Sequence, residues 1–126
     1  FVNTKPFIKH KRVIDIGAIA ERQKLSYFII TCDVMLHARE RGESFGLAIA
    51  EFMSLGKPVL AYNGGVDRNH CELLNDIGTL YTNPEGINRW LSDVELLKAP
   101  ELFKGRVSEF NPEQVMKKFH NVFIEG

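Results

Sequence analysis

Two glutamates separated by seven residues are the side chains of this sequence best suited to chemistry. Glu43 and Glu51 bracket an apolar run that predicts a short helix over residues 46–55. An unpaired buried carboxylate costs several kcal/mol, so Glu51 in such a helix indicates a helix face that borders a cleft. Because carboxylates accept hydrogen bonds from hydroxyl groups, the pair indicates a ligand with several hydroxyls.

Paired acids also suggest a glycosidase, in which two carboxyl groups flank one bond at roughly 5 to 9.5 Å. If the intervening segment is helical, eight steps of about 1.5 Å place Glu43 and Glu51 roughly 10 to 12 Å apart. That separation is too long for either hydrolase geometry. We therefore expect the two acids to hold two parts of one extended ligand.

The start of the predicted helix offers backbone donors beside the acids. The N–H groups of Phe45, Gly46 and Leu47 are expected at the helix N-terminus, where the helix dipole favours a phosphate or an electron-rich hydroxyl. Gly46 has no side chain and permits a ligand to approach closely.

Strands and helices must alternate to position these groups. Apolar and β-branched runs predict strands at residues 12–16, 33–37, 59–62 and 79–81, and apolar periodicity predicts helices at 21–31, 46–55, 69–75, 84–92 and 112–123. This alternation is typical of the α/β class, with a Rossmann-like parallel sheet flanked by helices on both faces.

Local signals set the expected helix ends. Gly56 suits the position after helix 46–55, and Asp67 is the expected N-cap of helix 69–75. An apolar stripe on the last helix is most simply interpreted as core, and it consists of Val115, Phe119, Val122 and Phe123.

Ligands of open parallel sheets bind at the carboxyl ends of the strands. Along this chain, that edge is predicted to gather Gly17, the loop 39–45 and the glycine turn 63–65. We expect these loops to share one cleft.

Composition narrows the classes of partner. The chain has 126 residues, enough for one domain, and its formal net charge of +0 argues against nucleic acid or an anionic membrane as partner. No transmembrane or signal segment is apparent. Cys32 and Cys71 lie far apart in the sequence and belong to no metal-binding motif, which predicts reduced thiols in a cytoplasmic setting. The sequence also contains no Asp-x-Asp pair of the kind that binds a metal ion.

Four consecutive motifs resemble a known family. Residues 33–38, 42–47, 51–59 and 64–65 are similar, in order and spacing, to the C-terminal nucleotide-sugar domain of retaining glycosyltransferases of the GT-B architecture, specifically the glycosyl transferases group 1 (family 4). The resemblance implies that residues 1–126 form the donor-binding domain, one half of a GT-B enzyme. The chain begins at Phe1 rather than Met, and we expect it to be an excised domain. The resemblance further implies an N-terminal acceptor domain of the same polypeptide outside this sequence, without which no transfer is expected.

The resemblance also assigns roles. It implies that Glu43 holds the hydroxyls of the reacting sugar, that Glu51 accepts hydrogen bonds from the ribose, and that backbone groups after the first strand hold the base. The expected site has Glu43 as the catalytic residue and, as donor-binding residues, Glu51, Ser44, Phe45, Gly46, Leu47, Gly17, Ala18 and Arg39. Neither a metal nor a cofactor other than the nucleotide-sugar donor is expected.

The chain departs from the family pattern before Glu43. The usual Pro-Ser is replaced by His37-Ala38, followed by a longer charged loop that makes Arg39 and Arg41 candidates for contacts specific to a subgroup. The family's basic diphosphate ligands normally lie earlier than Phe1, and Arg39 is a candidate for part of that charge.

Other interpretations remain open at this point. Glu51 could be a surface acid paired with Lys57 or Arg39, and Glu43 could simply stabilise the helix N-terminus. His37 and His70 are more often structural than catalytic in such positions. At the level of function, the alternatives are a nucleotide-sugar epimerase of GT-B architecture and a non-catalytic flavodoxin-like interaction domain.

Overall fold

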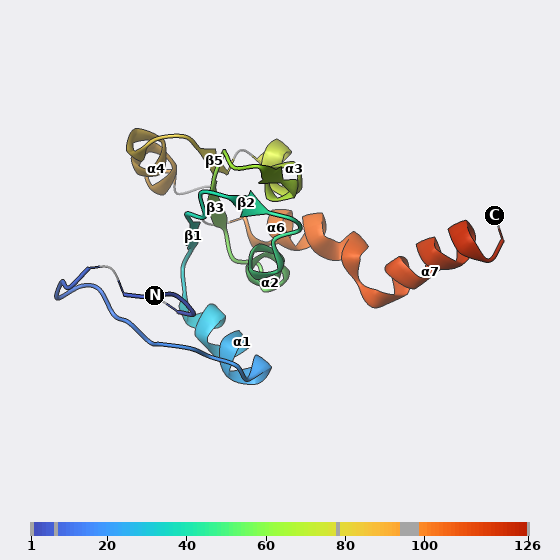
Figure 1. Cartoon of the computed structure of the whole chain (residues 1–126), viewed down its shortest axis with the longest axis horizontal. Coiled ribbons are helices and arrows are strands. Elements are labelled where there is room, and N and C mark those ends of the chain that lie inside the picture. The colour runs from blue at the N-terminus through green and yellow to red at the C-terminus, as the bar shows by residue number, and fades with distance from the viewer. Residues whose placement is uncertain (1, 7, 78, 94–98, 126) are drawn as a thin grey trace. The chain divides into compact units, whose positions relative to one another are not determined.

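The computed structural model describes residues 2–6, 8–77, 79–93 and 99–125 (Figure 1). The chain forms two compact units, Phe1–Thr31 and Cys32–Gly126, each of which is described by itself.

In its described residues, the first unit contains one helix, α1 (Arg22–Thr31), whose bounds lie within one residue of the predicted segment. The strand predicted at residues 12–16 is wrong, because this segment has irregular backbone and is mostly exposed. Local bonds replace a strand ladder on either side of it: Val13 N–H donates to His10 O at 2.9 Å, and Gly17 N–H donates to Asp15 Oδ1 at 3.0 Å. A β-branched run becomes a strand only when a neighbouring strand pairs with it, and none is described within this unit.

The second unit is built on a three-stranded parallel sheet. Its strands are β1 (Met35–His37), β3 (Val59–Tyr62) and β5 (Leu80–Tyr81), in the order β1-β3-β5. The prediction for residues 59–62 is confirmed residue for residue. Both pairings are parallel, as predicted, with His37 opposite Ala61 and Tyr62 opposite Tyr81.

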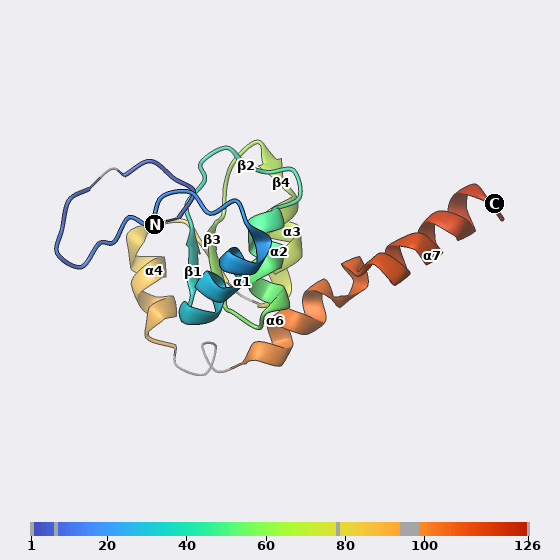
Figure 2. The same cartoon turned by 90° about the horizontal axis from the view of Figure 1, so that it is seen from below.

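Helices lie on both sides of these strands. Figure 2 shows α4 (Pro84–Leu91) on one side and α2 (Leu47–Ser54), α3 (Asn69–Leu74) and α6 (Pro100–Val107) on the other. Between the sheet and α4, Leu60, Tyr81 and Trp90 form a buried cluster. The fold is therefore the predicted Rossmann-like α/β arrangement of parallel strands flanked by helices.

Helix α6 packs against α2 and was not predicted. Phe103 of α6 is fully buried, as are Ile49 and Met53 of α2. Two signals mark this helix in the sequence: Pro100 at its first position, and acidic and basic residues in its first and last turns. Gly105 weakens the helical pattern, which explains why the helix escapes sequence inspection.

The end of α2 agrees with prediction at Gly56. Gly56 has φ +70°, its N–H donates to Met53 O at 2.9 Å, and Lys57 N–H donates to Phe52 O at 3.0 Å. This is the Schellman arrangement, in which a left-handed residue after the helix satisfies two terminal carbonyls.

A second, two-stranded parallel sheet joins β2 (Gly42–Glu43) to β4 (Asp67–Arg68). The prediction that Asp67 caps α3 is wrong, because Asp67 belongs to β4 and pairs with Gly42. Strands of two residues carry no periodicity, so they arise from contacts between distant loops rather than from a local pattern.

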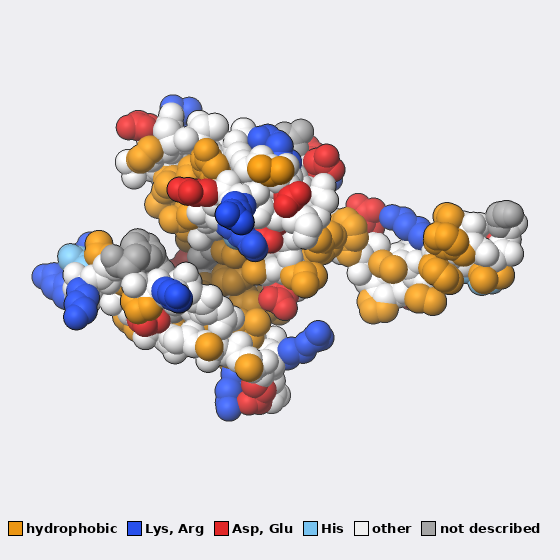
Figure 3. Space-filling model, in the orientation of Figure 1, with side chains coloured by type: hydrophobic (Ala, Val, Ile, Leu, Met, Phe, Trp, Pro, Cys, Tyr) orange, Lys and Arg blue, Asp and Glu red, His pale blue; other side chains and the backbone are white. Residues whose placement is uncertain are grey.

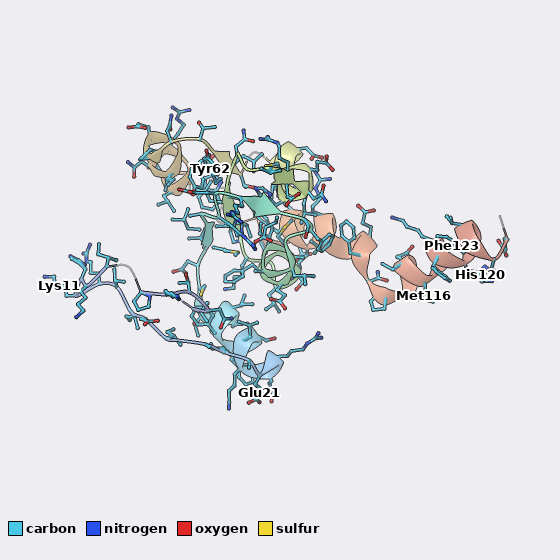
Figure 4. All side chains as sticks on the ribbon, viewed as in Figure 1. Lys11, Glu21, Tyr62, Met116, His120 and Phe123 are labelled. Atoms are coloured by element: carbon cyan, nitrogen blue, oxygen red, sulfur yellow. The ribbon has the colours of Figure 1, made fainter. Side chains whose placement is uncertain are left out.

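The last helix, α7 (Pro112–Phe123), begins and ends where the sequence predicts. The interpretation of its apolar stripe as core is wrong, because Val115, Phe119, Val122 and Phe123 are 45 to 71% exposed. Figure 3 shows hydrophobic side chains gathered along this helix, and Met116, His120 and Phe123 can be followed along it in Figure 4. A short 3₁₀ helix, η2 (Ser108–Phe110), precedes it.

Candidate functional site

The carboxyl edge of the sheet brings two loops together. His37 ends β1 and Tyr62 ends β3, and the loops that follow them meet through the β2–β4 pairing. Val66 N–H donates to Arg41 O at 3.1 Å within this junction. The two loops therefore adjoin each other, whereas the expectation that they share one cleft stays a prediction. Gly17 and Ala18 lie in the other unit, and their part in the site stays a prediction.

Two basic side chains contact the carboxylate of Glu43. Arg39 Nη1 donates to Oε1 at 3.0 Å and to Oε2 at 3.1 Å, and His37 Nε2 lies 3.1 Å from Oε1. The Glu43 side chain is 19% exposed. Glu43 lies at the end of β2, three residues before Gly46, the N-cap of α2. It therefore does not occupy the first helical turn, and its charge is balanced by side chains.

The charge of Glu43 results from two opposing effects. Burial raises the pKa of this carboxyl, but hydrogen bonds from His37 and Arg39, together with the positive charge of Arg39, outweigh burial and lower the pKa below its ordinary value. Glu43 is accordingly ionised at neutral pH and accepts, rather than donates, hydrogen bonds.

His37 and His70 are both buried at this edge, with ring centroids 5.7 Å apart. His70 Nε2 lies 2.9 Å from Tyr62 O and 3.3 Å from Cys71 Sγ, so this ring ties α3 to the end of β3. His70 is thus a structural residue here. His37 contacts a predicted site residue, a role that its strand-end position alone does not indicate.

The start of α2 presents backbone donors beside Glu43. Gly46 is the N-cap residue with φ +92°, a left-handed conformation that favours glycine, and it makes no side-chain cap. Ala50 N–H donates a helical hydrogen bond to Gly46 O at 3.0 Å. The N–H groups of Leu47 and Ala48 come earlier in the chain, in the first turn, where a helix offers no carbonyl partner. These donors suit an anion.

Ser44 and Phe45 connect Glu43 to this helix. The side-chain amide of Asn69 donates to Ser44 O, which fixes the connection to α3. The Phe45 ring meets Phe110 edge-to-face, with centroids 5.1 Å apart. Neither Asn69 nor Phe110 is predictable as a site neighbour from the sequence, because both come from distant segments.

Glu51 is exposed and lies one turn after Leu47 on the same face of α2. Both side chains border a groove of about 670 Å³ between α2 and the segment from α6 to α7. The groove is lined by Phe45, Leu47, Ala50, Glu51, Ser54, Lys104, Val107, Ser108, Phe110, Asn111 and Val115. Arg39 binds Glu43 rather than Glu51. Because α2 begins only at Leu47, the rise per helical residue used to estimate the distance between Glu43 and Glu51 applies only from Leu47 to Glu51.

Over the described residues, no three His, Cys, Asp or Glu side chains gather into a metal-binding group. None of the helices in the described parts of the chain has the length and apolar character that crossing a bilayer requires. Cys32 and Cys71 do not form a disulfide.

Comparison with known proteins gives one family. The family model described as Glycosyl transferases group 1 matches residues 9–101, a range that includes Glu43, Glu51 and all described strands. No curated protein and no solved structure matches the chain. The match ends within α6 and leaves α7 outside.

Proposed function

Because the chain belongs to the glycosyl transferases group 1 family, we propose that it is the donor domain of a retaining glycosyltransferase of GT-B architecture and binds a nucleoside-diphosphate sugar. The family supports glycosyltransferase activity in general. The donor class, the retaining outcome and the assignment to family 4 are parts of the proposal.

The observation that carries the proposal is the junction of β1, β2 and α2. An ionised carboxylate, Glu43, and the uncapped N-terminus of α2 lie together at the carboxyl edge of the parallel sheet. A carboxylate accepts hydrogen bonds from sugar hydroxyls, whereas open N–H groups stabilise phosphate oxygens. A nucleoside-diphosphate sugar contains both groups, joined at the bond that breaks.

In this proposal each residue has a physical task. Glu43 accepts hydrogen bonds from the sugar and fixes its orientation, while Leu47 and Ala48 N–H groups stabilise the charge that develops on the leaving diphosphate. Glu51 accepts hydrogen bonds from the ribose hydroxyls. Ser44, Phe45 and Gly46 contribute backbone groups between the two acids, and Arg39 contributes positive charge at the rim.

The contacts to the base and to the acceptor are proposed for residues outside the segment from β1 to α2. Gly17 and Ala18 provide backbone groups to the base, and an acceptor domain of the same polypeptide provides the second substrate. Under this proposal residues 1–126 bind donor weakly and transfer nothing alone. The donor sugar acts as substrate, and no metal or further cofactor takes part.

The direct test is a binding panel on this chain. UDP-glucose, GDP-mannose and ADP-glucose, with the three bare diphosphates, are titrated into ¹⁵N-labelled protein and followed by NMR. We expect at least one nucleotide sugar to shift the amide signals of Leu47 and Ala48. Glu51→Gln should weaken that binding, whereas Glu85→Gln, which changes an exposed acid in the first turn of α4, should not.

Two outcomes would contradict the proposal. If no nucleotide or nucleotide sugar shifts any signal near α2, the flavodoxin-like interaction domain becomes the better interpretation. If the full-length enzyme converts a nucleotide sugar into its epimer without transfer to any acceptor, the epimerase alternative holds.

A further inference from the structure

We propose that His37 is a positioning residue for Glu43, which leaves one carboxylate oxygen of Glu43 with spare capacity for a ligand hydroxyl. This inference rests on the proposed function for its ligand, but the contact itself concerns only residues of this chain. His37 stands where the family resemblance leads one to expect proline, so the contact is a feature of this chain.

The first step concerns the two oxygens of Glu43. Oε1 lies 3.0 Å from Arg39 Nη1 and 3.1 Å from His37 Nε2, whereas among the described residues Oε2 is contacted by Arg39 Nη1 alone, at 3.1 Å. Each carboxylate oxygen accepts about two hydrogen bonds. Oε1 is therefore filled by protein donors, and Oε2 keeps an unused acceptor site.

The second step concerns the proton on His37. An ionised carboxylate only accepts, so the hydrogen bond to Oε1 requires the proton on Nε2. Nδ1 is buried and has no hydrogen-bond partner among the described residues, which leaves it as an unused ring nitrogen. The structure thus assigns the Nε2–H tautomer through the contact with Glu43.

The third step concerns rigidity. His37 is 8% exposed, ends β1 opposite Ala61, and its C=O accepts from the Tyr81 hydroxyl at 3.4 Å. The Arg39 side chain is 62% exposed and reaches Glu43 from a loop. An exposed arginine retains rotamer freedom, whereas a buried ring at a strand end does not. His37 is therefore the fixed partner that sets the carboxylate plane.

NMR tests the contact without any ligand. The ¹⁵N shifts of the His37 ring in wild-type protein should report Nε2–H, and Glu43→Gln should change them because a neutral amide replaces the carboxylate. A ring with its proton on Nδ1, or ring signals identical in wild-type and Glu43→Gln proteins, would overturn the proposal.

Binding tests what the contact does. The probe is whichever of UDP-glucose, GDP-mannose and ADP-glucose the wild-type chain binds, together with its bare diphosphate. His37→Gln can place an amide N–H near the position of Nε2, whereas the shorter His37→Asn cannot. We expect His37→Asn to weaken nucleotide-sugar binding about tenfold, with the bare diphosphate changed less than about twofold, and His37→Gln to restore most of the loss.

Comparing His37→Asn with His37→Gln separates a role of His37 in positioning Glu43 from a general role in keeping the fold. Equal losses in His37→Asn and His37→Gln, or equal losses for the nucleotide sugar and its diphosphate, would overturn the positioning role. If the wild-type chain binds none of the probes, the donor-binding proposal fails, and the NMR measurement still decides the contact between His37 and Glu43. Amide spectra of both variants confirm that the fold is kept.

Discussion

At the scale of single residues, the chemistry of this chain depends on how Glu43 is kept ionised. His37 and Arg39 both contact its carboxylate, and they outweigh the burial that opposes a charge. The two glutamates stand out in the sequence because of their spacing, but the side chains that contact them cannot be identified from the sequence. The partners of Glu43 come from a strand end and a loop whose relation is set only by folding.

This environment predicts a pH dependence of stability. The folded pKa of Glu43 lies below its unfolded value, so its contribution to stability is present above the unfolded pKa and is lost as pH falls through the folded pKa. Urea unfolding of wild-type and Glu43→Gln proteins between about pH 6 and pH 3 checks this. The free-energy difference between them should shrink toward low pH. A difference that stays constant or grows would contradict the account, and the exposed Glu113→Gln serves as control.

At the scale of elements, local patterns predicted most of the sheet and its helices. Strand β3 and helix α7 match their predicted bounds, because each has a dense apolar pattern between clear turn or proline signals. The failures have physical reasons. Residues 12–16 have strand-like composition but no partner strand among the described residues of their unit, and β2 and β4 exist only through long-range pairing. The adjoining of the two loops at the carboxyl edge was predictable, but the contact between the buried His37 and Glu43 was not.

The end of α2 gives a test of one such local prediction. A Cβ on Gly56 would lie 2.9 Å from Pro100 Cβ, and its φ of +70° disfavours any side chain. Gly56→Ala should lower the free energy of unfolding by roughly 1 to 2 kcal/mol. Gly105→Ala is the matched control, because a Cβ there meets nothing within 4 Å and alanine favours helix, so stability should rise by up to about 1 kcal/mol. Equal effects in urea unfolding would contradict the assigned cap.

Helix α6 gives a second test, because it was not predicted. Phe103 is fully buried against the core, whereas its neighbour Leu102 is 44% exposed. Phe103→Ala should destabilise the protein by about 3 to 5 kcal/mol, and Leu102→Ala by less than about 1 kcal/mol. Thermal unfolding of the two variants measures the contrast. Similar losses would mean that α6 does not pack as described.

At the scale of the whole molecule, the family match covers the sheet and the proposed donor site but stops within α6. Beyond it, Phe103 of α6 is the last buried side chain of the described residues, and α7 follows. None of the described residues of α7 is buried, although its composition is that of an amphipathic helix. Sequence periodicity indicates that a helix has an apolar face, but it does not indicate what that face packs against.

This contrast predicts unequal protection along the chain. An unpacked helix of 12 residues is marginal in water, whereas α2 and α6 contribute to the core. Amide hydrogen exchange should therefore be fast throughout α7 and much slower in α2 and α6 of the same molecule. Protection of α7 equal to that of α6 would show that its apolar face is covered in solution.

The most direct test of the central claim is a comparison of affinities by calorimetry for one nucleotide sugar and its bare diphosphate. We predict that Glu43→Gln chiefly weakens binding of the nucleotide sugar, so the ratio of the two affinities falls. Glu51→Gln should weaken both ligands similarly, because both contain the ribose. Equal effects of Glu43→Gln on the two ligands, or affinities that neither substitution changes, would contradict the proposal that these two acids hold the two ends of a nucleotide sugar.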